Sequence, residues 1–263
     1  MINFKRVFAM VLRYTYNLKH SLDRLSDMFY WPLLDLLIWG VTGLYLARLN
    51  VHSSSNYLFI ILNGLIFWII VWRAQYEINT NLLSELWDKN ILNLFVSPLK
   101  IQEWILSFMI FGFIKSLISM FFSASIAFLL YGYNIFQYGP WLLIFLTSLL
   151  LTGWAGGFLV AGFLIRYGER IQTLAWGGIA IIIPFSALYY PVSVLPTWAQ
   201  KVALFFPSSY VFESLRDYLF TKQVHFDKLF VSFGLNVIYL TLALIFFRYM
   251  FNKSKKLGIG RLI

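Results

Sequence analysis

The sequence predicts an all-α, polytopic membrane protein with six transmembrane helices, an N-terminal amphipathic interface helix and an outer helical hairpin. Three observations predict this fold class. Of the 263 residues, 60% are hydrophobic and 12% are charged, whereas a soluble domain is about 45–50% apolar and about 25% charged. Six stretches approach the roughly 20 apolar residues that cross a bilayer. Most Lys and Arg residues flank alternate stretches. An ordinary soluble enzyme and a disordered chain are therefore excluded.

Residues 1–24 are expected to form a helix lying in the membrane interface. Apolar side chains recur there at helical spacing, while most basic side chains lie elsewhere on the helical wheel. The apolar series is Phe4, Val7, Phe8, Val11, Leu12, Thr15 and Leu18. Arg13 interrupts the apolar run too early for a cleaved signal peptide. The alternative is a short soluble helix before the first span.

The predicted spans belong to one domain covering residues 1–263. Pro184 is expected to kink the fifth span, because proline removes a backbone hydrogen bond and clashes with the preceding turn. Gly153, Gly157 and Ala161 form a ridge of small residues on the fourth span, which predicts close helix packing. The spans are 29–47, 57–72, 105–130, 141–165, 173–190 and 229–249.

The charge distribution predicts that both termini are cytoplasmic. With six spans, 15 of the 21 Lys and Arg residues lie on the side of the termini, five lie on the other side, and Lys115 lies within a span. Basic residues favour the cytoplasmic side. The sequence therefore predicts a multi-pass protein of the plasma (inner) membrane with a cytoplasmic tail at 250–263. The net charge of +10 then records membrane orientation rather than a nucleic-acid surface.

Two loops are long and apolar. In the outer segment 191–228, Pro196-Thr197 predicts a helix start, Pro207 a break, and Ser208 or Ser209 the cap of a second helix. This hairpin either dips into the outer leaflet or caps the protein outside. The inside loop 73–104 carries an apolar series around Trp87. It is either a helix lying against a partner or a solvated connector.

Recognisable catalytic and metal-binding motifs are absent. The sequence has no Cys and no GxxxxGK[ST] phosphate-binding loop, and its three His residues are widely separated. We therefore expect no enzyme activity, no metal site and no cofactor in this chain. Asp35 and Lys115 fall within spans, where charges usually face the bundle interior or a wet cavity. They either line or gate a pathway, separately or as a pair, or reach the interface by snorkelling.

Three stretches together resemble the membrane subunit of ABC-2 type exporters, and the resemblance covers nearly the whole chain. They are NILNLFVSPLKIQEWILS (90–107), LIRYGERIQTLAW (164–176) and PFSALYYPVSVLPTWAQKVALFFPSSYVFESLRDYLF (184–220). The third is the most specific, with its Tyr-Pro, its Leu-Pro, and a later Pro and Arg. Phe206 departs from the Asn that many members have before the corresponding proline, which weakens the transfer of a polysaccharide substrate.

The resemblance implies a permease without its own ATPase site. It would work as a dimer with a second copy or a related permease, and separate ATP-binding subunits would hold ATP and Mg. Residues 82–96 would form the coupling helix and 166–172 a second contact. Glu85 would be an ionic contact and Trp87 an apolar anchor. The full coupling set is Glu85, Trp87, Asp88, Arg166, Glu169 and Arg170. The pathway or gate set is Asp35, Lys115, Tyr189, Tyr190 and Pro191.

The expected substrate is hydrophobic or amphipathic: a drug, a lipid or a lipid-linked glycan. The expected partners also include membrane lipids and exclude nucleic acid. A secondary transporter or channel without an ATPase is the alternative, and it predicts ion-coupling carboxylates and related halves. An integral-membrane enzyme or structural partner is a third reading, and it would need a polar cluster at one membrane face.

Overall fold

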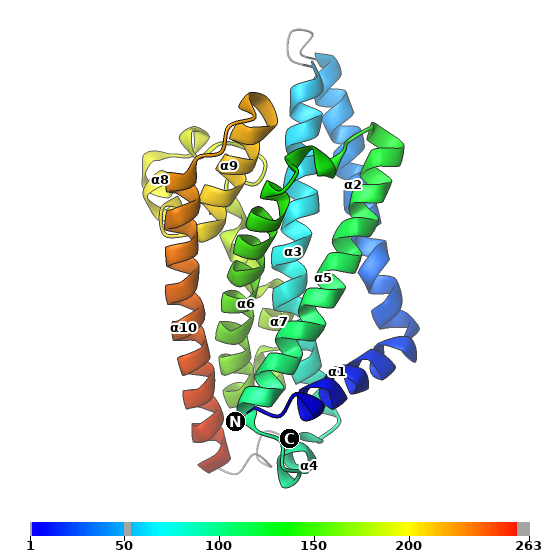
Figure 1. Ribbon diagram of the computed structural model, residues 1–263, viewed down its shortest axis with the longest axis vertical. Helices are drawn as coiled ribbons and strands as arrows, with labels where there is room; N and C mark the ends of the chain where they lie inside the picture. The colour runs from blue at the N-terminus through cyan, green and yellow to red at the C-terminus, as the bar shows by residue number, and fades with distance from the viewer. Residues whose placement is uncertain (1, 50–53, 257–263) are drawn as a thin grey trace.

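The computed structural model describes residues 2–49 and 54–256, and these ranges contain helices but no strands. Long helices run side by side, α7 lies among them, and other short helices, such as α4 and α8, lie at the two ends of the bundle (Figure 1). The helices in chain order are α1 (Phe4–Lys19), α2 (Leu22–Leu49), α3 (Ser54–Trp87), α4 (Ile91–Val96), α5 (Ile101–Tyr131), η1 (Ile135–Tyr138), α6 (Trp141–Tyr167), η2 (Gly168–Ile171), α7 (Thr173–Gly177), η3 (Gly178–Phe185), η4 (Val192–Val194), α8 (Thr197–Ala203), α9 (Pro207–Thr221) and α10 (Phe226–Lys256).

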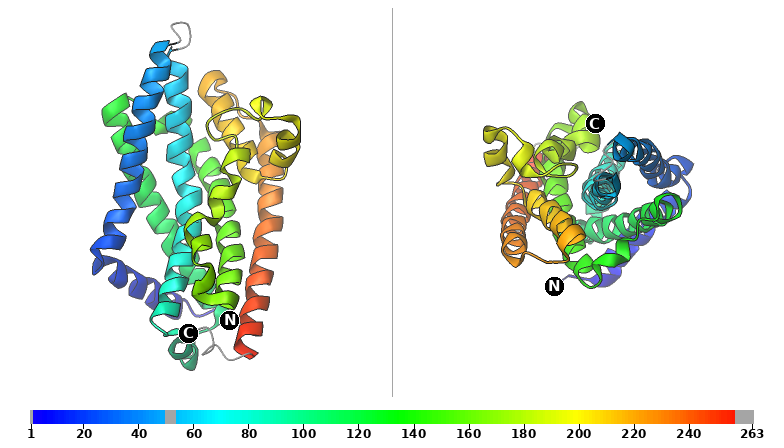
Figure 2. Two further views of the ribbon diagram at one scale, coloured as in Figure 1. Left: turned by 180° about the vertical axis from the view of Figure 1, so that it is seen from behind. Right: turned by 90° about the horizontal axis from the view of Figure 1, so that it is seen from above.

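The start of α1 and the end of α10 lie at the same end of the bundle (Figures 1 and 2). We call this the α1 end, and we call the opposite end, which holds α8 and α9, the hairpin end. The predicted tail at 250–263 is helical as far as Lys256. Residues 257–263 lie outside the described part of the chain, as do residues 50–53 of the first predicted outer connection.

Within the described ranges, five helices are long and apolar enough to cross a membrane: α2, α3, α5, α6 and α10. They confirm a polytopic, all-α membrane protein. The fifth predicted span differs, because residues 173–190 are helical only over Thr173–Phe185. The five α-helical and eight 3-10 residues rise about 24 Å, short of the roughly 30 Å hydrocarbon core. A continuous fifth span is therefore not reproduced.

The break in this segment follows from its sequence. Gly177 and Gly178 stand where α7 gives way to the 3-10 helix η3, and glycine weakens a helix interior. Pro184 cannot donate a backbone hydrogen bond. Just beyond, Ala187 has a left-handed φ of 56°, which is uncommon for a residue with a Cβ. Arg216 of α9 donates a hydrogen bond of 2.6 Å to the Ala187 carbonyl and so holds this turn.

The second predicted span is longer than expected. The prediction ended it at residue 72, but α3 continues as one helix to Trp87. Its 34 residues make it about 51 Å long, roughly 20 Å longer than the hydrocarbon core is thick. The predicted coupling helix 82–96 is corrected accordingly: residues 82–87 end α3, and only α4 is a separate helix.

The predicted packing role of the small residues on α6 is confirmed. A Cβ on Gly153 would lie 2.6 Å from the Val71 carbonyl oxygen and 2.6 Å from the Ala74 side chain. Gly157 faces Gln75 and Ile78 of α3 in the same way. Glycine at these positions lets α6 and α3 approach closely.

Polar contacts join α6 to α10 within the bundle. The Asn236 amide donates to the Ser148 carbonyl at 2.9 Å, and the Thr152 hydroxyl donates to Asn236 Oδ1 at 2.8 Å. Ser232 contacts Ser148 at 2.8 Å and donates to the Pro207 carbonyl. Because these groups are buried, their hydrogen bonds fix the register of α10 against α6 and α9.

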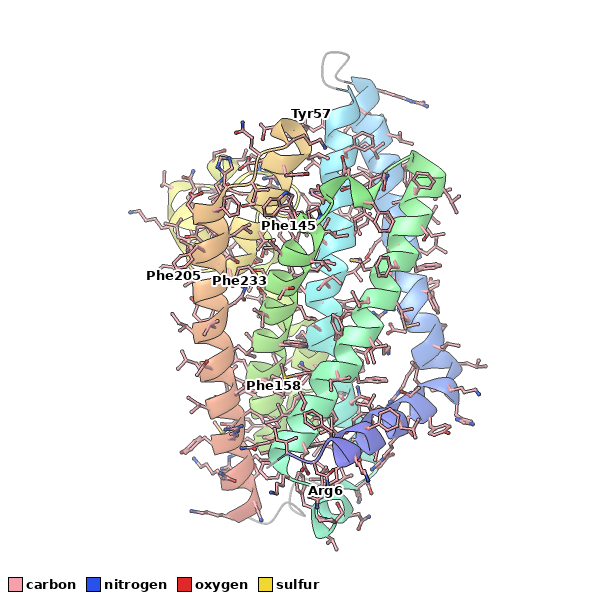
Figure 3. All side chains as sticks on the ribbon, in the orientation of Figure 1. Arg6, Tyr57, Phe145, Phe158, Phe205 and Phe233 are labelled. Atoms are coloured by element: carbon pink, nitrogen blue, oxygen red, sulfur yellow. The ribbon has the colours of Figure 1, made fainter. Side chains whose placement is uncertain are left out.

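Phe145 and Phe158 of α6 are fully buried, whereas Phe205 beyond α8 is exposed (Figure 3).

Two short helices occupy the predicted hairpin segment. As predicted, α8 begins at Thr197, after Pro196. The start of α9 differs, because Pro207 is its first residue and Phe206 its N-cap. Proline is well suited to the first helical position, since its missing N–H has no partner there in any case. Ser208 is buried instead and contacts Ser186 at 2.8 Å, which ties α9 to the end of η3.

Helix α1 crosses one end of the bundle, whereas the long helices run along the bundle axis (Figure 1). Its apolar side chains divide into two faces, not the single face predicted. One packs against the protein, and the other leaves four large side chains exposed. The buried residues are Val7, Met10, Val11 and Tyr14. The exposed residues are Phe4, Phe8, Leu12 and Tyr16.

Candidate functional site

Four charged side chains form a chain of alternating sign near the α1 end. Arg73 of α3 is fully buried and donates to Asp27 of α2 at 2.7 Å. It also lies 3.5 Å from Glu77, one helical turn along α3. Lys115 of α5 lies 2.6 Å from the same Glu77 carboxylate. We call Asp27, Arg73, Glu77 and Lys115 the charge network.

The charge network balances two acidic and two basic groups. Buried charges are costly unless they are paired and hydrogen-bonded, and charges at membrane depth face the interior of a bundle or a wet cavity. Here α2, α3 and α5 each contribute at least one member, so the network ties three helices together. The same helices, together with α1 and α7, line a pocket beside the network.

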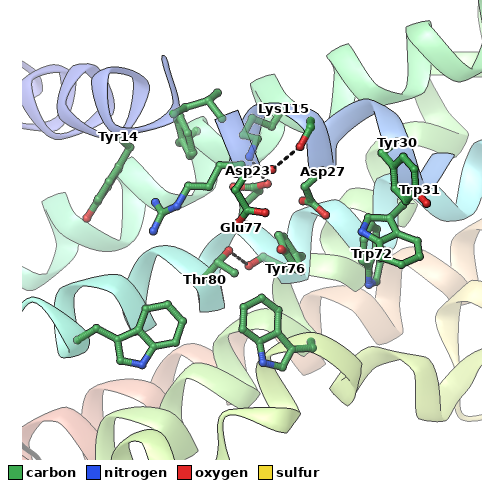
Figure 4. Close-up of a pocket in the computed structure, with 16 residues that line it drawn as sticks. Tyr14, Asp23, Asp27, Tyr30, Trp31, Trp72, Tyr76, Glu77, Thr80 and Lys115 are labelled. Carbon is green, nitrogen blue, oxygen red and sulfur yellow. Dashed lines mark hydrogen bonds and ion pairs between the residues drawn. The ribbon is translucent and has the colours of Figure 1, made fainter. Parts of the chain in front are cut away.

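This pocket has a volume of about 710 Å³. Half of its lining residues are aromatic, and the rest include both acidic and basic side chains. Figure 4 shows Asp27, Glu77 and Lys115 gathered at its wall, with Tyr30, Trp31 and Trp72 at one side. We call it the α1–α2 pocket. Its lining residues are Tyr14, Leu18, Asp23, Arg24, Ser26, Asp27, Tyr30, Trp31, Trp72, Tyr76, Glu77, Thr80, Trp87, Phe111, Lys115 and Trp176.

Tyr14 of α1 lines this pocket and is held in place by contacts with α5. Its ring stacks on Phe108 of α5 at 5.5 Å, and its hydroxyl accepts a hydrogen bond of 2.9 Å from the Trp104 indole. Burial, with the Glu85 charge nearby, raises the pKa of the Tyr14 hydroxyl. The hydroxyl therefore stays neutral, and Tyr14 forms part of the pocket wall.

A stripe of polar and aromatic residues runs along α2 from the pocket toward the hairpin end. Asp27, Trp31, Asp35 and Trp39 recur every four residues, and side chains at this spacing share a helix face. Trp31, Asp35 and Trp39 are exposed on the surface of this chain. At the far end, the Trp39 ring stacks on Tyr189 at 5.4 Å. We call Asp27, Trp31, Asp35 and Trp39 the α2 stripe.

The predicted pathway residues divide between these two features. Asp35 belongs to the α2 stripe, and Tyr189 contacts its end. Lys115 instead belongs to the charge network. The alternative in which Asp35 pairs with Lys115 is wrong, because Lys115 pairs with Glu77 and Asp35 makes no ion pair within the described residues. Tyr190 donates to the Pro184 carbonyl at 2.9 Å, and Pro191 precedes η4.

The predicted coupling residues at the end of α3 differ in exposure. Glu85 is only 1% exposed and accepts from Arg13 of α1 at 3.0 Å and from Asn90 at 2.7 Å. Its carboxylate thus lies inside the chain and not on a solvated face. Trp87 is exposed and stacks on Trp176 of α7 at 6.5 Å. Asp88 is exposed in the turn that follows α3.

The second predicted coupling segment lies at the same end of the bundle. Arg166 falls in the last turn of α6, and Glu169 and Arg170 lie on the short helix η2. Glu169 and Arg170 are exposed. The Trp87–Trp176 stack brings this part of the chain beside the end of α3. The structure therefore places both predicted coupling segments on one face of the molecule.

Sequence reasoning missed three members of the charge network: Asp27, Arg73 and Glu77. It assigned Arg73 and Glu77 to a loop because hydropathy falls after Trp72. A usable signal was present, since Arg73 and Glu77 are four residues apart and no Gly or Pro lies between Arg73 and Asp88. A charge pair at this spacing supports a continuing helix.

Comparison with known proteins agrees with this architecture. A sequence model of the ABC-2 type transporter family matches residues 10–220. A search of curated proteins found no match. The matched region includes the charge network, the α2 stripe and all of α9 except its last residue. This chain belongs to the ABC-2 type transporter family and is a multi-pass membrane permease of that family.

Proposed function

We propose that this chain is the membrane subunit of an ATP-driven exporter, in which two copies enclose the pathway and separate ATP-binding subunits supply the energy. The observation that carries this proposal is the exposed α2 stripe. Membership in the ABC-2 type transporter family provides the functional context. The substrate is hydrophobic or amphipathic, because the exposed side chains along the stripe are mainly aromatic.

Asp35 provides the physical argument. A carboxylate facing hydrocarbon costs several kcal/mol, about 2.5–3.5 by insertion measurements and more by other estimates. Asp35 is exposed in this chain, yet it lies on an apolar helix of membrane-spanning length. A second copy of the chain, or water in a pathway between two copies, would remove it from lipid. A related permease could serve in place of an identical copy.

The α1 end offers a docking face for the ATP-binding subunits. Trp87, Asp88, Glu169 and Arg170 are exposed there. Helix α4 projects from the same end (Figure 1). ATP and Mg would be held by the partner, since this sequence has no phosphate-binding loop. The role of Glu85 changes from direct contact to positioning, because it holds α1 and the start of α4 from inside.

Contacts around α4 explain how movement would be transmitted. Arg6 of α1 donates to the Pro98 carbonyl and lies 3.5 Å from Glu103, at the start of α5. Arg13 holds Glu85, which in turn accepts from Asn90 before α4. A push on α4 would therefore move α1 and α5 with it. Rigid-body displacement of packed helices is a common means of opening a path between subunits.

The orientation of the chain is part of the proposal. Lys253, Lys255 and Lys256 lie in the last turn of α10, at the α1 end, and basic residues favour the cytoplasmic side. Both termini would thus be cytoplasmic in the plasma membrane. Helix α1 would lie in the interface, with Phe4 and Phe8 in the lipid. The segment 191–228 would close the exit, either within the outer leaflet or as a cap.

Co-expression with ATP-binding subunits encoded by neighbouring genes tests this function. The wild-type chain is expected to co-purify with one such subunit and to hydrolyse ATP as a complex. Trp87→Ala combined with Asp88→Lys should weaken this association at least tenfold. Trp198→Ala, an exposed tryptophan of α8 at the hairpin end, is the matched control and should not. Substrate movement driven by an ion gradient without any ATPase would contradict the proposal.

A further inference from the structure

The α1–α2 pocket has a composition that selects one kind of ligand. We propose that it binds a lipophilic organic cation, and that such cations are the substrate class of this permease. The assignment of these cations as the substrate class rests on the proposed function, whereas the binding of a cation in the pocket does not.

Two rings that line the pocket already contact an organic cation of the chain itself, Arg73, which is buried and is not a lining residue. The Arg73 guanidinium lies 4.9 Å from the centroid of the Trp72 ring and 5.4 Å from that of Tyr76. Both rings line the pocket. Lys115 lies over Phe111 in the same way, at 5.7 Å. Aromatic faces attract cations through their quadrupole, and more strongly where water is excluded.

Further rings in the pocket are not occupied by the charge network. Tyr30, Trp31, Trp87 and Trp176 line the pocket, and each is at least 40% exposed. They come from α2, α3 and α7, so they surround the opening from different helices. Several aromatic rings around one space are the arrangement by which proteins recognise alkylated ammonium groups.

The charges of the pocket leave a carboxylate available to a ligand cation. Three carboxylates line it, from Asp23, Asp27 and Glu77, against two basic groups, from Arg24 and Lys115. The Lys115 charge is neutralised by an ion pair with Glu77 at 2.6 Å. Asp23 makes no ion pair within the described residues, and its carboxylate is exposed at the pocket. Asp27 is paired with Arg73 at 2.7 Å, so in the described part of the chain Asp23 and Arg24 are the lining charges without an ion-pair partner. A ligand cation can pair with Asp23, and the exposed aromatic faces, which attract cations, decide the sign of the ligand.

The size and position of the pocket suit an amphiphile. Its volume of about 710 Å³ lies within the roughly 300–1,000 Å³ of small-molecule sites. Tyr14 and Leu18 of α1 form part of its lining, so it opens beside the helix proposed to lie in the membrane interface. The α2 stripe begins in the pocket, at Asp27. A ligand bound there would stand at the start of the proposed pathway.

Tetraphenylphosphonium and tetraphenylborate test the inference, because they have nearly the same shape and opposite charge. Binding of each is measured by equilibrium dialysis to the full chain in nanodiscs, with empty nanodiscs subtracted. Neither an ATPase nor a nucleotide is present, so failure of the proposed function would not affect the result. The wild-type chain is expected to bind the phosphonium saturably and the borate at least tenfold more weakly.

Variants assign this binding to the pocket. Asp23→Asn and Trp31→Ala should each weaken phosphonium binding about tenfold, equivalent to about 1.4 kcal/mol. Arg24→Gln should strengthen it, which a merely structural role would not predict. The matched controls Asp227→Asn and Trp198→Ala alter exposed residues outside the pocket and should change nothing. Equal binding of both ions, or binding unaltered by Asp23→Asn and Trp31→Ala, would overturn the inference.

Discussion

At the scale of single residues, the charge network explains how a membrane helix accommodates arginine and glutamate. Arg73 and Glu77 lie on the part of α3 that extends toward the α1 end, and each contacts an opposite charge on another helix. The sequence predicted that Lys115 was unusual but could not identify its partner. Glu77 had been assigned to a loop, and a contact between residues 77 and 115 depends on tertiary packing that spacing alone does not reveal.

Removing one member of the network should be far more costly than removing a pair. Glu77→Gln leaves Lys115 and Arg73 with Asp27 as their only acidic neighbour in the network. We expect it to lower the free energy of unfolding by about 3–5 kcal/mol, as for other broken buried pairs. Glu77→Gln combined with Lys115→Gln removes one charge of each sign and should recover much of that loss. Thermal unfolding in detergent measures both.

An exposed ion pair provides the control for this prediction. Lys228 lies 2.8 Å from Asp217 at the hairpin end, where both side chains are partly exposed. Lys228→Gln should therefore cost about 1 kcal/mol or less. A Glu77→Gln variant as stable as Lys228→Gln would show that the network does not hold α2, α3 and α5 together.

At the scale of helices, the contact of α6 with α3 was predictable and the shape of the α7–η3 segment was not. Glycines at spacing four imply a close contact whatever the partner, and the structure supplies α3 as that partner. Hydropathy identified residues 173–190 as apolar but could not distinguish a spanning α-helix from a shorter 3-10 helix. Gly177, Gly178 and Pro184 each weaken the α-helix, and their combined effect depends on packing against α8 and α9.

Gly153→Ala tests the close contact between α6 and α3. The new methyl group would lie 2.6 Å from the Val71 carbonyl oxygen, which is backbone and cannot rotate away. Overpacking of this kind costs about 1–3 kcal/mol, so thermal unfolding should occur at a lower temperature. Gly234→Ala on α10 is the matched control, because nothing lies within 4 Å of its Cβ. Equal effects of the two substitutions would contradict the packing described.

Arg13→Gln tests the link between α1 and the start of α4. It removes the cation that compensates the buried Glu85 carboxylate. Backbone amides of α1 and α4 should exchange hydrogen at least tenfold faster, while those of α6 and α10 remain protected. Lys5→Gln changes an exposed basic residue of the same helix and serves as the control. Faster exchange throughout the bundle would mean that Arg13 supports the whole fold and not this link.

At the scale of the whole molecule, length and composition were sufficient to predict the helical membrane architecture. Five of the six predicted spans correspond to long apolar helices. The two predicted coupling segments, the end of α3 and η2, lie at one end of the bundle, and their contact with an ATP-binding subunit stays a prediction. What could not be foreseen is which helix faces are exposed. The α2 stripe is recognisable only when Trp31, Asp35 and Trp39 are seen to remain uncovered in a single chain.

Cysteine cross-linking tests most directly the claim that two copies enclose a pathway along the α2 stripe. The sequence contains no cysteine, so Asp35→Cys introduces a unique thiol. Phe230→Cys, at an 83% exposed position on α10, is the control. In native membranes, a bis-maleimide is expected to join two Asp35→Cys chains into a dimer and to leave Phe230→Cys chains monomeric. Cross-linking at Phe230→Cys with none at Asp35→Cys would contradict the account.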